Sequence, residues 1–248
     1  EGREICAAAF SREKGYLQDW RVTQRVYSAN LLKSAYDAMV KERLGRAQDG
    51  YEYFVISTLA KKQVTVSDLV ALDYYYGRGV NGDAMLDSYK FIRSALDFQA
   101  AIEAICGYQA SLGEEFTGEA KGASDKLIQL LMNDWYERLS DEDKIAVVPE
   151  LANIIGADHL SVELLRFVRD DAYALWCSGG VLDNSSPLWE WFEIAKELRQ
   201  GLNPSDEYAV MEAAAERHLQ DNYTRFKVWE GYSEQPIRIF VSAHKPSQ

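Results

Sequence analysis

Asp170, Asp171 and Tyr173 are the residues whose types and spacing best suit chemistry, because they follow one another closely on a predicted helix over residues 161–177. Carboxylates and a phenol that converge in a deep pocket can exchange protons with a substrate, provided that a carboxylate has a perturbed pKa. These residues define one hypothesis for the function: an all-α enzyme with a carboxylate- and tyrosine-lined pocket between two helical halves.

The pair Asp170-Asp171 resembles the start of the magnesium-binding motif of terpene synthases, which are all-α enzymes. The third aspartate of that motif is missing, since Ala174 stands nearest to its place. Asn133-Asp134 also lacks the Ser or Thr and the Glu that would make it the second motif of that family. The alternative is that Asp170 and Asp171 belong to a solvated helix face.

Other chemical motifs are missing from the sequence. A ferritin-like carboxylate site requires Glu-x-x-His on two helices, and none of His159, His218 and His244 has a glutamate at that spacing. The 3 cysteines are far apart in the sequence and form no Cys-x-x-Cys pair, which favours neither a disulfide framework nor a zinc site. There is neither a phosphate-binding loop nor a nucleophile elbow. We therefore predict no metal, no cofactor and no catalytic residue outside the pocket hypothesis.

Composition places the chain among acidic globular proteins. Hydrophobic residues make up 47% of the 248 residues, charged residues make up 27%, and the net charge is −12. The negative charge lies between the two ends, because residues 1–46 carry 9 basic and 6 acidic side chains. No apolar run approaches the roughly 18 residues of a membrane-spanning helix. Nucleic acid and anionic membranes bind through cationic side chains, so we predict neither as a partner. The acidic charge suits a basic protein partner, and the alternative is that it serves solubility alone.

The start of the chain does not define a compartment. Glu1 is not followed by the charged and then apolar segments of a signal peptide, although Ile5-Cys6-Ala7 is followed by further small residues. A cytoplasmic origin and an exported origin with the signal removed are both open alternatives.

Hydrophobic residues recur at three- and four-residue spacing through most of the chain, which predicts an all-α protein of about eight helices. The helical ranges are 16–44, 51–62 (alternatively a strand), 68–76, 84–107, 124–139, 161–177, 187–200 and 205–224, with a further helix opened by Ser140. In the helix over 161–177, Trp176 continues the apolar stripe. Residues 225–232 and 237–244 are aromatic and β-branched, which predicts a short C-terminal β-hairpin.

The predicted helices divide into two groups at a glycine-containing segment. Residues 113–123 contain glycine and few apolar side chains, which favours a linker or loop. We therefore predict an N-terminal helical half over 1–112, a linker over 113–123, a C-terminal helical half over 124–224 and a hairpin tail over 225–248. One compact domain is the alternative, and the helices form an irregular bundle or a repeat-like array.

The segment Gly77-Arg78-Gly79-Val80-Asn81-Gly82-Asp83 resembles the turn of a Sel-type helical repeat, a unit related to tetratricopeptide repeats. The match runs from Ala71 to Ala95 and includes Tyr74 and Tyr89. It departs from the repeat pattern at Asp87, where a small residue is expected, and no second copy follows at the repeat spacing. The resemblance implies a protein-binding scaffold without catalysis.

Aromatic residues beside charged ones suggest how such a scaffold would bind. Three consecutive tyrosines on one helix cannot all face the core, because neighbouring side chains are about 100° apart. Exposed Tyr and Trp among charged residues are typical of partner-binding surfaces. The predicted partner-binding residues are Tyr74, Tyr76, Arg78, Trp189 and Glu190. For Trp189 the alternative is packing against a neighbouring helix. The leading hypothesis is thus a non-catalytic protein-binding module: an adaptor, an inhibitor or an immunity-type protein.

Overall fold

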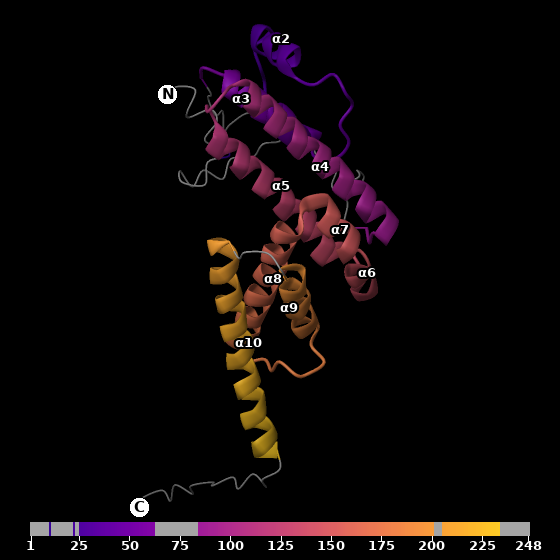
Figure 1. The fold of residues 1–248 in the computed structure, drawn as a ribbon, viewed down its shortest axis with the longest axis vertical. Helices are drawn as coiled ribbons and strands as arrows, with labels where there is room; N and C mark the ends of the chain where they lie inside the picture. The colour runs from indigo at the N-terminus through magenta and orange to yellow at the C-terminus, as the bar shows by residue number, and fades with distance from the viewer. Residues whose placement is uncertain (1–9, 11–21, 23–24, 63–83, 201–204, 234–248) are drawn as a thin grey trace, which may run out of the picture. The chain divides into compact units, whose positions relative to one another are not determined.

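The computed structural model describes residues 10, 22, 25–62, 84–200 and 205–233, with side chains up to residue 225. Within these residues all regular secondary structure is α-helical, apart from short turns, which confirms the predicted fold class (Figure 1). The chain forms two compact units, Glu1–Ile155 and Gly156–Gln248, which we call unit 1 and unit 2. The boundary between the units therefore lies after Ile155, whereas the sequence analysis placed a division at residues 113–123.

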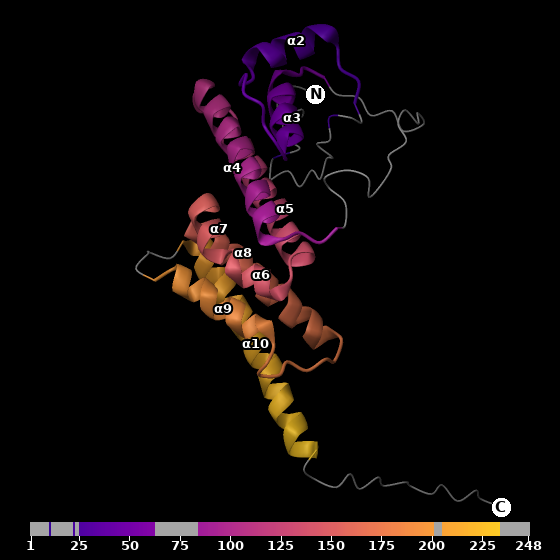
Figure 2. The ribbon, with the colours of Figure 1, turned by 90° about the vertical axis from the view of Figure 1, so that its right-hand side faces the viewer.

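Unit 1 is built around three helices that pack on one another. Its described helices are α2 (Ala29–Ala38), α3 (Gln48–Leu59), α4 (Ser88–Ser111), α5 (Thr117–Arg138), α6 (Asp141–Ala146) and α7 (Val148–Ile155). α3, α4 and α5 contact one another, α2 covers α3, and α6 and α7 pack against α4 (Figure 2). The core between them contains the fully buried side chains of Phe54, Phe91, Leu131 and Trp135. Burial of large apolar side chains such as these stabilises the unit.

Helix starts in unit 1 follow local capping chemistry. The carboxylate of Asp87 accepts a hydrogen bond from the Lys90 backbone N–H at 2.8 Å, so α4 begins after Asp87. This explains why an aspartate stands where the repeat pattern expects a small residue. Ser140 caps α6 in the same way, as the sequence predicted, and its first turn is acidic.

Helix boundaries in unit 1 differ from the sequence prediction by a few residues, and most of all at the start of α5 and in α2. The predicted linker is helical from Thr117 onward, and the predicted cap Ser124 lies inside α5, where its hydroxyl donates to the Ala120 carbonyl at 2.9 Å. A serine can lie inside a helix when its hydroxyl bonds back to a carbonyl of the preceding turn, so it does not have to mark the start of a helix. The helix predicted over 16–44 is also shorter where it is described, because α2 covers only Ala29–Ala38.

The described part of unit 2 contains three helices, α8 (Ala157–Cys177), α9 (Pro187–Leu198) and α10 (Asp206–Ser233). α9 and α10 both pack along α8 (Figure 2). Ser186 and Pro187 start α9 as predicted, with the Ser186 hydroxyl accepting from the Leu188 backbone N–H. The core between the three helices consists of the buried side chains of Leu160, Leu164, Leu165, Val168, Trp191, Phe192 and Leu219.

The predicted C-terminal hairpin is wrong in its first strand. Residues 225–232 belong to α10, which continues without a break to Ser233 (Figure 1). Adding a residue to an existing helix costs much less than starting one, so propagation from a formed helix overrides the local β preference of aromatic and β-branched residues. The second predicted strand, 237–244, lies outside the described residues.

Candidate protein-binding surface

The residues predicted to bind a partner fall in two places. Tyr74, Tyr76 and Arg78, with the repeat-like turn that contains Arg78, lie outside the described residues. Trp189 and Glu190 lie in the first turn of α9. The Trp189 side chain is half-buried, its Nε1 donates to the Asp183 carbonyl at 3.1 Å, and its ring meets that of Tyr223 edge-on at 5.9 Å. Trp189 therefore packs against α10, while Glu190 is exposed.

The residues of the enzyme hypothesis lie on α8. Asp170 is exposed and pairs with its neighbour Arg169 at 2.6 Å, whereas Asp171 is half-buried. Tyr173, one turn further along, is 54% exposed. Within the described part of the chain, no group of three or more His, Cys, Asp or Glu side chains is arranged to hold a metal ion. A catalytic role for Asp170, Asp171 and Tyr173 stays a prediction.

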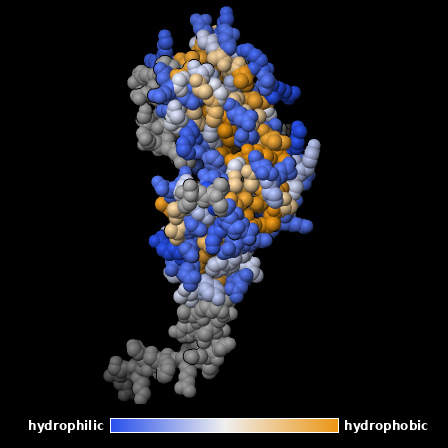
Figure 3. Space-filling view, viewed as in Figure 1, coloured by the Kyte–Doolittle hydropathy of each residue, from blue (hydrophilic) through white to orange (hydrophobic). Residues whose placement is uncertain are grey.

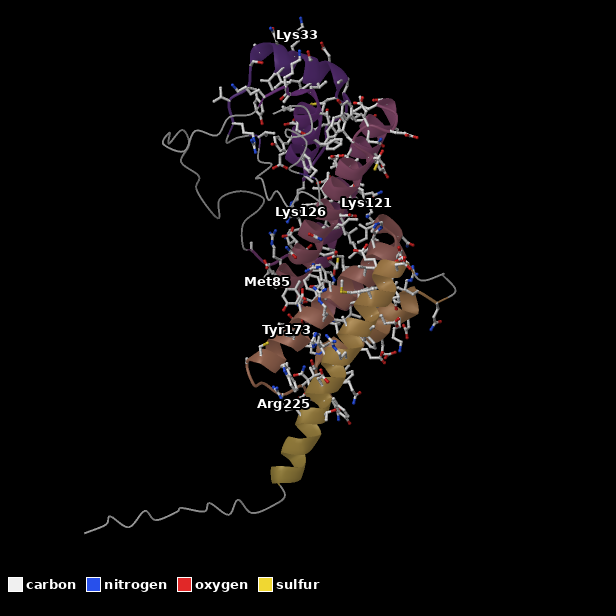
Figure 4. All side chains as sticks on the ribbon, turned by 90° about the vertical axis from the view of Figure 1, so that its left-hand side faces the viewer. Lys33, Met85, Lys121, Lys126, Tyr173 and Arg225 are labelled. Carbon is white, nitrogen blue, oxygen red and sulfur yellow. The ribbon has the colours of Figure 1, made fainter. Side chains whose placement is uncertain are left out.

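Tyr173 instead belongs to a surface that α8 and α10 form together. Trp176, which follows it on α8, is 40% exposed. The His218 ring of α10 lies 5.3 Å from the Tyr173 ring, and the Arg225 guanidinium of α10 lies 3.5 Å from the centre of the Trp176 ring. Figure 4 shows Tyr173 and Arg225 along the junction of the two helices. We call Tyr173, Trp176, His218 and Arg225 the aromatic surface.

Arg225 fixes the end of α8 and, with it, the indole of Trp176. Its Nη1 donates to the Trp176 carbonyl at 2.9 Å and to the Gly180 carbonyl at 3.4 Å. The last carbonyls of a helix have no partner within the helix and carry the negative end of its dipole, which a guanidinium complements. The guanidinium also stacks on the indole, a contact worth about 0.5–2 kcal/mol. The exposed indole is therefore held in one orientation.

A buried amide holds α10 against α8 directly beneath the aromatic surface. Asn222 is fully buried, and its Nδ2 donates to the Ala172 carbonyl at 2.8 Å and to the His218 carbonyl at 2.7 Å. A buried hydrogen bond of this kind costs 1–3 kcal/mol when one partner is removed. It fixes the register of the two helices, so the side chains above it meet in defined pairs.

Acidic side chains border the aromatic surface. Asp170 precedes Tyr173 by three residues, and exposed Asp221 lies between His218 and Arg225 in the sequence of α10. Residues three or four apart share a helix face, so both carboxylates lie on the side of the surface. The Cys177 thiol, one turn after Tyr173, raises the pKa of the phenol. In the view of Figure 3, hydrophilic residues cover much of unit 2, with small hydrophobic areas among them.

The sequence analysis found Tyr173 but not the residues that surround it. Trp176 was placed in the apolar stripe of its helix, on the assumption that the whole stripe is covered. α8 ends one residue later, at Cys177, and Gly179-Gly180 follows, so nothing in the helix itself requires the last part of the stripe to be buried. Trp176 stands just before the two glycines that follow α8, and this position is the sequence signal that could have indicated its exposure.

Comparison with models of known protein families, with curated proteins and with solved structures finds no match to this chain. Across the described residues, no helix combines the length and the apolar character that crossing a bilayer would require. Function is therefore inferred from the geometry and charge of the aromatic surface.

Proposed function

We propose that this chain is a non-catalytic protein-binding module, of the adaptor, inhibitor or immunity type, that recognises a basic partner protein through the aromatic surface of unit 2. One observation carries the proposal: two large aromatic side chains, Tyr173 and Trp176, remain 54% and 40% exposed side by side on α8. Tyr74, Tyr76, Arg78, Trp189 and Glu190 remain predicted contacts that lie elsewhere on the chain.

Exposed Tyr and Trp side chains are suited to binding because they bury much area with little loss of rotational freedom. Trp, Tyr and Arg are the residues that most often dominate the energy of protein interfaces. Arg225 already holds the Trp176 indole in place, so binding does not have to order it. The aromatic surface is thus preorganised for binding.

The charge of the chain favours a basic partner. The net charge is −12, and exposed Asp221 supplies a carboxylate at the border of the aromatic surface, whereas the second carboxylate there, Asp170, is already paired with Arg169. The faces of indole and phenol rings also attract lysine and arginine side chains. Opposite charges at the border of an interface mainly accelerate association and select the partner, so we expect binding to weaken as salt concentration rises.

The test compares capture of proteins from the native source by the full chain and by the variants Trp176→Ala and Tyr173→Ala. We expect each variant to lose at least about tenfold in affinity for the captured protein, because truncation of a hot-spot aromatic costs about 2 kcal/mol or more and about 1.4 kcal/mol corresponds to tenfold. The matched control is Tyr89→Ala, since Tyr89 lies on α4 and is 75% exposed.

The outcome depends on the difference between the variants. Loss of one basic protein with Trp176→Ala and Tyr173→Ala, but not with Tyr89→Ala, supports the aromatic surface as the binding site. Equal capture by all four proteins refutes it, even if a partner is found. Far-UV circular dichroism of each variant checks that the helices have formed.

A further inference from the structure

A second aromatic contact lies in unit 1, where Phe10 fills a slot between α3 and α5. The Phe10 side chain is 5% exposed, and its ring lies 5.6 Å from that of Tyr53 and 5.5 Å from that of Phe54. Tyr53 and Phe54 both belong to α3, which is far from Phe10 in the sequence. We call Tyr53, Phe54 and Gly122 the Phe10 slot.

Gly122 of α5 makes the slot specific for a main chain as well as for a ring. A Cβ atom at this position would overlap the carbonyl oxygen of Phe10. The absence of a side chain thus lets the peptide backbone at Phe10 lie directly on the helix. Gly118, one turn earlier in α5, has nothing within 4 Å of the place where its Cβ would be, so only one of the two glycines serves this contact.

The walls of the slot are held by contacts that do not involve Phe10. The Phe54 ring meets the Tyr108 ring of α4 edge-on at 6.2 Å, and the Tyr108 hydroxyl is hydrogen-bonded to Thr58 of α3 at 2.9 Å. On the other side, the Arg25 guanidinium lies 4.3 Å from the centre of the Tyr53 ring. When one side chain is removed from a close-packed core, relaxation of its neighbours fills the cavity only in part.

We propose that the Phe10 slot is a separable peptide-binding site: it holds Phe10 of its own chain and accepts the segment that contains Phe10 from a second copy. The slot recognises two features of the segment: a phenyl ring, which contacts Tyr53 and Phe54, and the carbonyl of the same residue, which packs against Gly122. In its own chain the segment is tethered at an effective concentration that is typically in the millimolar range, so a competing segment binds best when the resident ring is missing. This proposal concerns unit 1 and does not depend on the proposed function of unit 2.

The test uses the full chain with Phe10→Ala and a fluorescent peptide that corresponds to residues 5–15. We expect saturable binding of the peptide to Phe10→Ala, measured by fluorescence anisotropy, and at least about tenfold weaker apparent binding to the unchanged chain, whose slot is occupied. A peptide with alanine in place of the phenylalanine is expected to bind about tenfold more weakly or not at all, since it lacks the buried ring.

Two glycine variants then locate the binding. In the Phe10→Ala background, Gly122→Ala is expected to abolish peptide binding, whereas Gly118→Ala is expected to leave it unchanged. If Phe10→Ala alone does not fold, recovery of its helical circular dichroism by the phenylalanine peptide, and not by the alanine peptide, supports the proposal equally. Absence of binding or recovery overturns it, and so does binding that Gly122→Ala leaves intact.

Discussion

Tyr208 lies where the three helices of unit 2 meet, and its environment changes how it titrates. The side chain is buried, the Arg199 guanidinium of the α9 C-cap lies 4.8 Å from its ring centre, and its hydroxyl donates to Glu212 at 3.3 Å. Burial and the neighbouring Glu212 carboxylate raise the pKa of Tyr208 to about 12. Arg199 also pairs with Asp158 at the start of α8, so this cluster joins all three helices.

Tyr208→Phe should reduce the loss of stability at alkaline pH. The folded-state pKa of Tyr208 is about 12, above the ordinary value of 10.0, so its contribution to folding is complete below pH 10 and is lost as the pH rises through 12. Tyr27 has a pKa raised to about 12 by burial, so part of the pH dependence remains in the variant. The measurement is the free energy of urea unfolding of both proteins between pH 9 and 12. Identical pH profiles would contradict this account.

Trp176 shows why single residues are hard to assign to a surface from sequence. Its spacing is that of a core residue on α8, and its neighbours Ala172 and Val168 are buried as that spacing predicts. Its exposure follows from the end of the helix and from Arg225, a residue that is 49 positions away in the sequence. Periodicity describes a face of one helix and contains no information on how far the next helix covers it.

Among the elements of unit 1, a buried ion cluster connects α4, α5 and the segment before α3. The Asp134 carboxylate of α5 pairs with Arg46 at 2.7 Å and with Arg138 at 3.1 Å. Arg46 also donates to Ser94 of α4 at 2.8 Å. The Arg138 Nε donates to the Ala84 carbonyl at 3.0 Å, which holds the chain that leads into α4. One carboxylate thus pairs with two guanidinium groups that position three segments.

Asp134→Ala should lower the free energy of unfolding by about 3 kcal/mol, because it leaves two largely buried guanidinium groups without their carboxylate. The control is Asp170→Ala, which removes an exposed ion pair and is expected to cost about 1 kcal/mol or less. Urea unfolding of the two variants and the unchanged chain measures the difference. Equal effects of the two substitutions would show that the Asp134 cluster is as solvated as a surface pair.

The start signals of helices were reliable where the cap and the first turn agreed, as at Ser140 and at Ser186-Pro187. The signal at Ser124 failed, because α5 begins at Thr117 and runs through Gly122, where the Phe10 backbone packs. Residues 225–232 have the composition of a strand but extend α10, because propagation of a formed helix overrides their local β preference. A window of a few residues contains neither the distant contact at Gly122 nor the helix that precedes residue 225.

At the scale of the whole molecule, the two units have separate cores. Leu131 and Trp135 are buried in unit 1, and Leu164 and Leu219 are buried in unit 2. A unit with its own core and its own ion pairs contains what a domain requires to fold. The division after Ile155 therefore has a direct consequence for folding.

A fragment of residues 156–248 should fold by itself. We expect helical circular dichroism, a cooperative urea transition and, if the proposed function holds, binding of the same partner as the full chain, because α8, α9 and α10 contain the whole aromatic surface. Cutting within the predicted linker, at residue 118, should instead produce two poorly folded pieces, since α4 and α5 pack against each other. A cooperative transition for the piece 1–118 would contradict this division.

The sequence by itself determined that the protein is helical and acidic, because the spacing of apolar residues and the balance of charge are properties of the chain alone. It also determined several helix starts, which depend on residues a few positions apart. Only the tertiary structure decided which aromatic residues are exposed, where the units divide and which carboxylate holds two arginines. These properties depend on pairs such as Trp176 with Arg225 and Arg46 with Asp134. Residues so far apart in the sequence are brought together only when the helices pack.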